Sequence, residues 1–233
     1  MGGSGLDRAA VNSVQWQGRH VPALPDVLLS ASMPPTHLLY LHGFRSSPQS
    51  TKARKMASVV QRLRQQGLDL TWACPQLPPS PMQAITELRE LVALWPRMST
   101  VVIGSSLGGF YATVLAESMG FRAALINPAV NPARDLARHI GEQTAFHDPT
   151  ERFYFRPEFI AQFEALSPHP IARPDHYWTL IAKGDEVLDW REMFAYYEGT
   201  LITLLDGSDH AVSDFDAHLP ALLNWIDLPL VAA

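Results

Sequence analysis

A serine flanked by glycines is the feature of this sequence with the most recognisable chemistry. Residues 104–108 spell G-x-S-x-G, directly after the apolar run 100–103 and before a predicted helix at 109–116. A strand that turns sharply into a helix holds strained backbone angles at the turn and lifts one hydroxyl above the sheet edge. Only Ser106 has glycine two residues before and two residues after it, so we predict Ser106, not Ser105, as an acyl-transfer nucleophile. The alternative is a glycine-rich turn whose serine only caps the helix.

A serine hydroxyl is a weak nucleophile until a base takes its proton. Enzymes with this turn carry their acid and then their histidine downstream of the serine. Asp185 follows a predicted strand at 177–182, and His210 follows another at 200–205 in a glycine-containing loop. The ends of successive parallel strands lie at one edge of a sheet. We therefore predict His210 as the general base and Asp185 as the acid that orients it.

Other acids and histidines compete for these roles. Asp189 is the main alternative acid, but it precedes Trp190 and is expected to cap the next helix. Glu186 and Asp209 are weaker alternatives. Among the nine histidines, His218 falls inside a predicted helix and is expected to be solvated or to pack.

A further turn upstream predicts a site for the negative oxygen of the transition state. His42-Gly43-Phe44 follows a short apolar strand at 37–41. We predict that the backbone N–H groups of Phe44 and Leu107 form an oxyanion hole. Losing one such donor costs about 2.7–4 kcal/mol of transition-state stabilisation. The alternative is an ordinary turn between a strand and a helix.

The elements that must position these groups alternate along the chain. Short apolar runs predict strands and helical spacing predicts helices, which together indicate parallel βαβ units. The expected fold is α/β, a mainly parallel sheet of about six or more strands with helices on both faces. The predicted strands are 37–41, 69–73, 100–103, 122–126, 177–182 and 200–205, and the predicted helices are about 49–66, 81–95, 107–119 and 214–225.

The alternation breaks between residues 127 and 175, where we expect an insertion that forms a small helical cap over the sheet edge. Two helices are predicted in it, near 132–141 and 157–166. Its aromatic side chains either line an acyl pocket or pack the cap onto the body. They are Phe146, Phe153, Tyr154, Phe155, Phe159 and Phe163.

Composition bounds the class of protein. A chain of 233 residues suits one α/β domain, which is expected at 36–233. A poorly defined lead-in is expected at 1–35, and its first five residues have the composition of a cloning remnant. A net charge of −5 without a basic cluster argues against nucleic acid or an anionic membrane as partner. No run approaches the ~20 apolar residues of a membrane-spanning helix, and the start lacks a signal-peptide pattern. We expect a cytoplasmic protein.

Cysteine and histidine spacing predicts no metal site. The single cysteine, Cys74, excludes an intramolecular disulfide and fits a reducing compartment. It carries no catalytic signature and is expected to end a strand. Neither a metal nor a cofactor is implied.

Several motifs together resemble the YqiA-like esterases of bacteria, within the α/β-hydrolase superfamily. They span about residues 37–225 and comprise Tyr40-Leu41-His42-Gly43-Phe44 with Ser46-Ser47-Pro48, residues 104–109, Asn127-Pro128-Ala129-Val130, residues 184–189 and the His210 loop. The resemblance implies a compact cytoplasmic carboxylesterase or thioesterase whose triad falls on Ser106, Asp185 and His210. The chain departs from the expected pattern at Arg45, at Asn131 and at Ser208-Asp209. Arg45 at the mouth either favours an anionic substrate or is a solvated side chain.

The predicted activity is therefore two-step acyl transfer through an acyl-enzyme, with a small-molecule acyl ester or thioester as substrate. The same triad acting on an amide, C–C or polyester bond is one alternative, and a non-catalytic ligand-binding module is another. Acyl length, leaving group and oligomeric state have no signature in the sequence.

Overall fold

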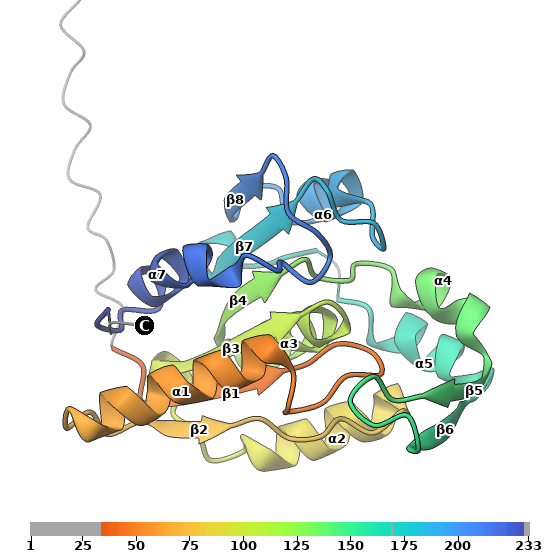
Figure 1. Ribbon diagram of the computed structural model, residues 1–233, viewed down its shortest axis with the longest axis horizontal. Coiled ribbons are helices and arrows are strands. Elements are labelled where there is room, and N and C mark those ends of the chain that lie inside the picture. The colour runs from red at the N-terminus through yellow and green to blue at the C-terminus, as the bar shows by residue number, and fades with distance from the viewer. Residues whose placement is uncertain (1–33, 169, 231–233) are drawn as a thin grey trace, which may run out of the picture. The chain divides into compact units, whose positions relative to one another are not determined.

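The computed structural model describes residues 34–168 and 170–230, so most of the expected lead-in at 1–35 lies outside the described residues. Six strands form one parallel sheet in the order β2-β1-β3-β4-β7-β8 (Figure 1). The strands are β1 (His37–Leu41), β2 (Thr71–Ala73), β3 (Thr100–Ser105), β4 (Arg122–Ile126), β7 (Tyr177–Ala182) and β8 (Leu201–Leu205). The predicted six-stranded parallel sheet is confirmed.

Helices cover both faces of this sheet, as the sequence predicts. They are α1 (Thr51–Gln65), α2 (Pro81–Leu91), α3 (Leu107–Met119), α6 (Trp190–Tyr196) and α7 (Phe215–Trp225). Side chains alternate along β1: Leu38 and Tyr40 pack with α1 and α7, whereas Leu39 and Leu41 pack with α2 and α3. This period of two follows from the pleat of a strand and divides the apolar core into two layers.

The register of the strands brings their carboxyl ends to one edge. Leu41 pairs with Gly104 and Ser105 with Ile126, while Ala182 pairs with Leu205 at the far side. In an open parallel sheet, ligands bind outside this edge. The loops that follow β1, β3, β4, β7 and β8 therefore meet there.

The insertion after β4 differs from the prediction. Its first helix, α4 (Pro132–Leu136), is shorter than expected and leads into a 3₁₀ turn at Ala137–His139. An antiparallel hairpin follows, made of β5 (Gly141–Thr144) and β6 (Arg152–Phe155), which the sequence analysis did not predict. The helix α5 (Glu158–Leu166) matches the second predicted helix. The insertion thus mixes helix and strand.

Hydrogen bonds attach the insertion to the loops at the sheet edge. The Gln162 side chain on α5 accepts hydrogen bonds from the Ser80 hydroxyl at 2.9 Å and the Met82 N–H at 3.0 Å, at the start of α2. Beyond the hairpin strand β5, the Phe146 N–H donates to the Arg45 carbonyl at 2.8 Å. The insertion is therefore fixed on the side of the sheet that carries α2 and α3.

Candidate active site

Ser106 occupies the turn between β3 and α3 with strained backbone angles. Its φ of 55° and ψ of −123° lie in a region that residues with a side chain rarely adopt. A Cβ on Gly104 would approach the Gly108 carbonyl oxygen to 2.4 Å, and one on Gly108 would approach the Leu41 carbonyl oxygen to 2.0 Å. Glycine at both positions is required because the backbone segments lie too close for a side chain.

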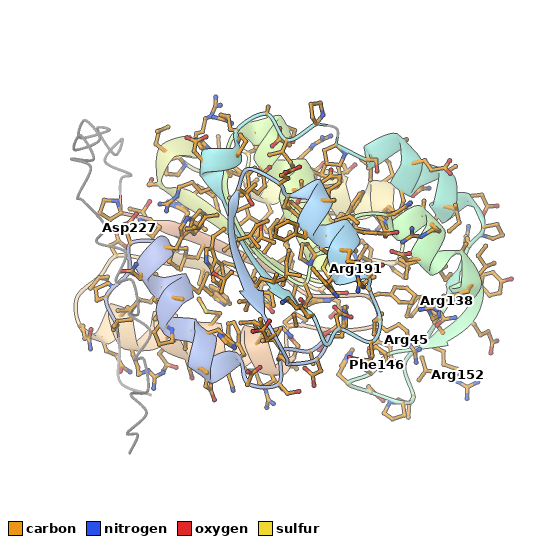
Figure 2. All side chains as sticks on the ribbon, turned by 90° about the horizontal axis from the view of Figure 1, so that it is seen from above. Arg45, Arg138, Phe146, Arg152, Arg191 and Asp227 are labelled. Carbon is orange, nitrogen blue, oxygen red and sulfur yellow. The ribbon has the colours of Figure 1, made fainter. Side chains whose placement is uncertain are left out.

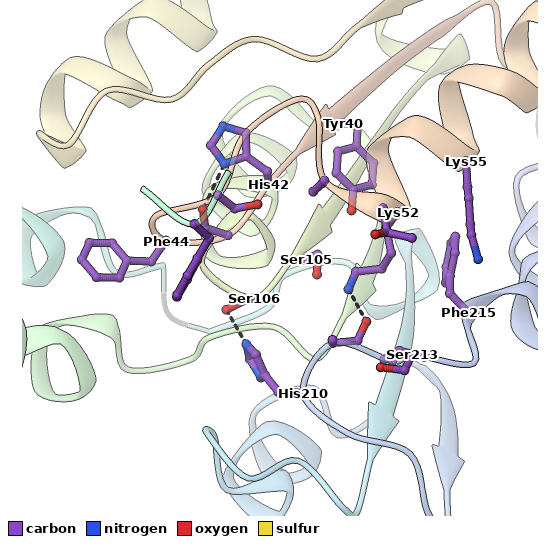
Figure 3. Close-up of a pocket in the computed structure, with 17 residues that line it drawn as sticks. Tyr40, His42, Phe44, Lys52, Lys55, Ser105, Ser106, His210, Ser213 and Phe215 are labelled. Carbon is purple, nitrogen blue, oxygen red and sulfur yellow. Dashed lines mark hydrogen bonds between the residues drawn. The ribbon is translucent and has the colours of Figure 1, made fainter. Parts of the chain in front are cut away.

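The three predicted groups form a hydrogen-bonded row. The Ser106 Oγ lies 3.0 Å from the His210 Nε2 (Figure 3), and the His210 Nδ1 lies 2.7 Å from the Asp185 Oδ2. The His210 side chain is 20% exposed, whereas the Asp185 side chain is fully buried. A row of hydroxyl, imidazole and buried carboxylate is an arrangement that can deprotonate a serine.

Asp185 is oriented by its own loop. Its Oδ1 accepts hydrogen bonds from the N–H groups of Val187 and Leu188, both at 2.8 Å. These two bonds occupy one carboxylate oxygen and leave the other for the His210 ring. A carboxylate held in this way keeps the imidazole in one orientation and one tautomer.

The alternative acids and histidine make other contacts. Asp189 caps α6 by accepting from the Arg191 N–H at 2.9 Å, as predicted. Asp209 accepts from Ser213, and Glu186 accepts from the backbone N–H of His210 at 3.0 Å, not from its ring. His218 lies on α7, 3.1 Å from the Asp214 carboxylate.

Asn127 makes a buried connection at the sheet edge that the sequence did not reveal. It follows β4, is fully buried and has a φ of 41°. Its Nδ2 donates to the carbonyls of Asp209 and His210 at 3.0 and 3.1 Å, and its Oδ1 accepts from the Ala182 N–H at 2.8 Å. One amide thus connects the ends of β4 and β7 with the His210 loop.

The turn after β1 carries a buried histidine that is locked by two hydrogen bonds. The His42 Nδ1–H donates to the Gly43 carbonyl at 3.0 Å, and its Nε2 accepts from the Leu77 N–H at 3.2 Å. Burial lowers the pKa of this imidazole, which suits a neutral acceptor. In the described residues, the N–H groups of Phe44 and Leu107 have no hydrogen-bond acceptor. Two backbone donors therefore remain available beside Ser106.

Ser106 lines two adjoining cavities. The first, here the α1 cavity, has a volume of about 480 Å³ and is lined by Ser50, Lys52, Lys55 and Ser213 as well as Ser106 and His210 (Figure 3). The second, here the cap cavity, has a volume of about 280 Å³. It lies against the insertion, and Ser106 and His210 line it too.

The lysines of the α1 cavity are engaged by neighbouring groups. The Lys52 Nζ donates a hydrogen bond to the carbonyl of Ala211, next to His210. Burial lowers the pKa of Lys52 to about 8, while the charges of Asp209 and Asp185 act in the opposite direction. Lys55 forms an ion pair of 2.7 Å with Asp216.

Most of the aromatic side chains in the insertion pack it onto the body. The Phe44 ring contacts Phe153 and Phe155 edge-on, with ring centroids 6.0 and 5.3 Å apart. Phe163 contacts Phe110 on α3 in the same way, at 5.6 Å. Phe146 differs, because it is 70% exposed and lines both cavities.

Cys74 directly follows β2 and is half-buried, and burial raises the pKa of its thiol to about 11. The described part of the chain contains no group of three or more His, Cys, Asp or Glu side chains placed to hold a metal. Nor does any described helix combine the length and apolar character needed to cross a membrane.

Comparison with known proteins gives a family and a fold. The model of the uncharacterised protein family UPF0227 matches residues 37–227. Among solved structures, α/β-hydrolase domain-containing protein 10 from mouse superposes with a TM-score of 0.61 at 15% identity, covering 82% of this chain and 89% of the mouse chain. A structure of the metagenome-derived lipolytic enzymes LipS and LipT superposes with a TM-score of 0.61 at 17% identity, covering 84% of this chain and 95% of that chain.

A third solved structure, the esterase domain of a Rhodothermus marinus protein, has a TM-score of 0.55 at 17% identity, covering 84% of this chain and 86% of that domain. Because the sequence identities are this low, the structural likeness shows a shared fold alone. All three neighbours are named as hydrolases or lipolytic enzymes.

Proposed function

Because the chain belongs to the uncharacterised protein family UPF0227, a YqiA-like group of the α/β-hydrolase superfamily, we propose that it is a serine hydrolase of carboxylic esters or thioesters. The single observation that carries this proposal is the row from Ser106 to His210 to Asp185, at 3.0 and 2.7 Å, open to two cavities. A ligand-binding module would not need this row.

In the first half of the proposed reaction, the Ser106 Oγ attacks the carbonyl carbon of the substrate and His210 takes the hydroxyl proton. The resulting imidazolium is stabilised by the buried Asp185 carboxylate. His210 then gives the proton to the departing alcohol or thiol as its bond to carbon breaks, which leaves the acyl group on Ser106. Water then attacks the acyl group with His210 again as the base, and the carboxylic acid leaves as the Ser106 hydroxyl regains its proton.

The negative oxygen of each tetrahedral intermediate requires donors that are already in place. The N–H groups of Phe44 and Leu107 are proposed to bind this oxygen. Support comes from their lack of other acceptors in the described residues and from the cap cavity, which Phe44, Leu107 and Ser106 all line. Donors fixed in the backbone need no reorganisation at the moment of reaction.

The test is hydrolysis of p-nitrophenyl esters from acetyl to palmitoyl by wild type and Ser106→Ala, with Cys74→Ala as the matched control. We expect turnover by wild type and the control and its loss in Ser106→Ala. Equal turnover by wild type and Ser106→Ala would overturn the proposal. Binding of esters without turnover by the wild type would favour a ligand-binding module.

A further inference from the structure

The interior of the cap cavity is apolar. It is lined by Leu107, Ala129, Pro132, Leu136 and Leu188. The α1 cavity also has apolar lining, but it carries the hydroxyl and ammonium groups of Ser50, Lys52 and Lys55 among it, so the hydrocarbon chain of an acyl group is better buried in the cap cavity. The leaving group would then face the α1 cavity.

Two arginines line the cap cavity beside these apolar groups. Figure 2 shows Arg45 and Arg138 near Phe146 at the insertion end of the ribbon. The Arg45 Nε donates to the Thr144 carbonyl at 2.6 Å, and its guanidinium lies 4.3 Å from the Phe146 ring centre. These contacts fix the Arg45 side chain against the hairpin.

Neither arginine has a carboxylate partner among the residues that the structure describes. Among the described residues that line this cavity, Asp135 is the one carboxylate, and it pairs at 2.7 Å with Arg134, which also pairs with Glu192 at 2.6 Å. The two positive charges also act on His139, whose pKa is lowered by burial and then by Arg138 and Arg45. The guanidinium groups of Arg45 and Arg138 therefore line the cavity without a carboxylate of the described residues in ion-pair contact.

The α1 cavity differs in this respect. Lys55 pairs with Asp216, and Lys52 is bonded to the Ala211 carbonyl while Asp209 and Asp185 act on its charge. The lysines of the α1 cavity are thus engaged by neighbouring groups, whereas Arg45 and Arg138 of the cap cavity have no carboxylate partner among the described residues.

We propose that the acyl group of the substrate lies in the cap cavity and carries a carboxylate or phosphate that Arg45 and Arg138 bind. This inference rests on the proposed ester hydrolysis and specifies its substrate class. Planar guanidinium groups match both anions because each can offer two parallel N–H donors. In a substrate with an apolar chain and an anionic end, the chain would contact the apolar lining of the cavity and the anion would contact the two arginines.

Three p-nitrophenyl esters that share a six-carbon acyl chain test this proposal. They are the hexanoate, the adipate half-ester with a terminal carboxylate, and the 6-phosphooxyhexanoate. We expect wild type to have a kcat/KM at least about tenfold higher for one or both anionic esters than for the hexanoate. The more favoured anion identifies the natural group, and added salt should reduce the preference.

The preference should fall about tenfold in Arg45→Gln and in Arg138→Gln, mainly through KM. Arg138 is exposed, so its variant remains informative if Arg45→Gln does not fold. The matched control is Arg152→Gln, because Arg152 is also exposed on the hairpin and lies 3.9 Å from Glu142. The control should keep the wild-type preference.

Equal kcat/KM for all three esters, or a preference unchanged in both arginine variants, would overturn the inference while leaving ester hydrolysis intact. Absence of Ser106-dependent turnover of every ester would instead overturn the proposed function and the inference with it.

Discussion

The Asn127 side-chain amide donates a hydrogen bond to the backbone carbonyl of His210, 3.1 Å away. The same Nδ2 also bonds the Asp209 carbonyl, and the Oδ1 bonds the Ala182 N–H at the end of β7. The loop of the proposed base is therefore held from β4, whose last residue also accepts the Ser106 N–H at 3.0 Å. Ser106 and the His210 loop are therefore both hydrogen-bonded to the buried end of β4, at Ile126 and Asn127.

Asn127→Asp should weaken catalysis by releasing this loop. Aspartate keeps an oxygen for the Ala182 N–H, but it faces the carbonyls of Asp209 and His210 with an acceptor instead of a donor. We expect kcat/KM for a p-nitrophenyl ester to fall by about 10²-fold, since small misplacements of catalytic groups are costly. The control is Asn131→Ala, which removes the α4 cap contact to the Arg134 N–H at 3.4 Å. A wild-type rate in Asn127→Asp would refute the positioning role.

Replacing each candidate acid in turn should show whether Asp185 or Asp189 acts with His210. Asp185→Asn keeps the size of the side chain but loses the charge beside His210, and the rate should fall by about 10³–10⁴-fold. Asp189→Asn retains a capping oxygen for α6 and should hydrolyse esters at about the wild-type rate. Steady-state kinetics on one ester compare both variants. The reverse ranking would move the acid role to Asp189.

Gly43→Ala should impair the reaction more than the fold. A Cβ at Gly43 would lie 3.2 Å from the Ser106 Cβ and 3.5 Å from its Oγ, so the nucleophile must shift. We expect a loss of at least about tenfold in kcat with a small change in Tm. Gly207→Ala is the control because a Cβ there meets no atom within 4 Å. Equal kcat in the two variants would show that the contact is harmless.

The buried His42 should make stability depend on pH. Burial lowers its pKa in the folded protein below the ordinary value of 6.5, which the unfolded chain retains. As the pH falls through 6.5, the unfolded state binds a proton before the folded state, so the free energy of unfolding decreases. Urea unfolding at about pH 7.5 and about pH 5.5 should show a larger loss in wild type than in His42→Gln. Identical losses would contradict this account.

Local patterns in the sequence predicted the sheet and the residues of the proposed triad. Apolar runs and the glycines around Ser106 predict a strand, a turn and a helix, and parallel strands bring Asp185 and His210 to the same edge. The turn at Ser106 is predictable because a Cβ at Gly108 would clash with the backbone of Leu41, which leaves few alternatives to glycine.

The insertion could not be predicted in the same way. The hairpin strands 141–144 and 152–155 alternate weakly, and a seven-residue connection separates them, longer than the two-residue turns that mark a hairpin most clearly. In the sequence, Asn127 is only a polar residue after a strand. Its contacts could not be predicted because its partners, Ala182, Asp209 and His210, are far away along the chain. Pairing between distant segments also brings Arg138 to the same cavity as Arg45. Such contacts depend on tertiary packing, which periodicity does not encode.

Covalent capture by a fluorophosphonate tests whether the Ser106 hydroxyl is the activated nucleophile. Wild type, Ser105→Ala and Ser106→Ala are each incubated with a fluorophosphonate, and the mass of the intact protein is measured, followed by peptide mapping. We expect one adduct, on Ser106, in wild type and Ser105→Ala, and none in Ser106→Ala. An unlabelled wild type that is folded, or an adduct that persists in Ser106→Ala, would contradict it.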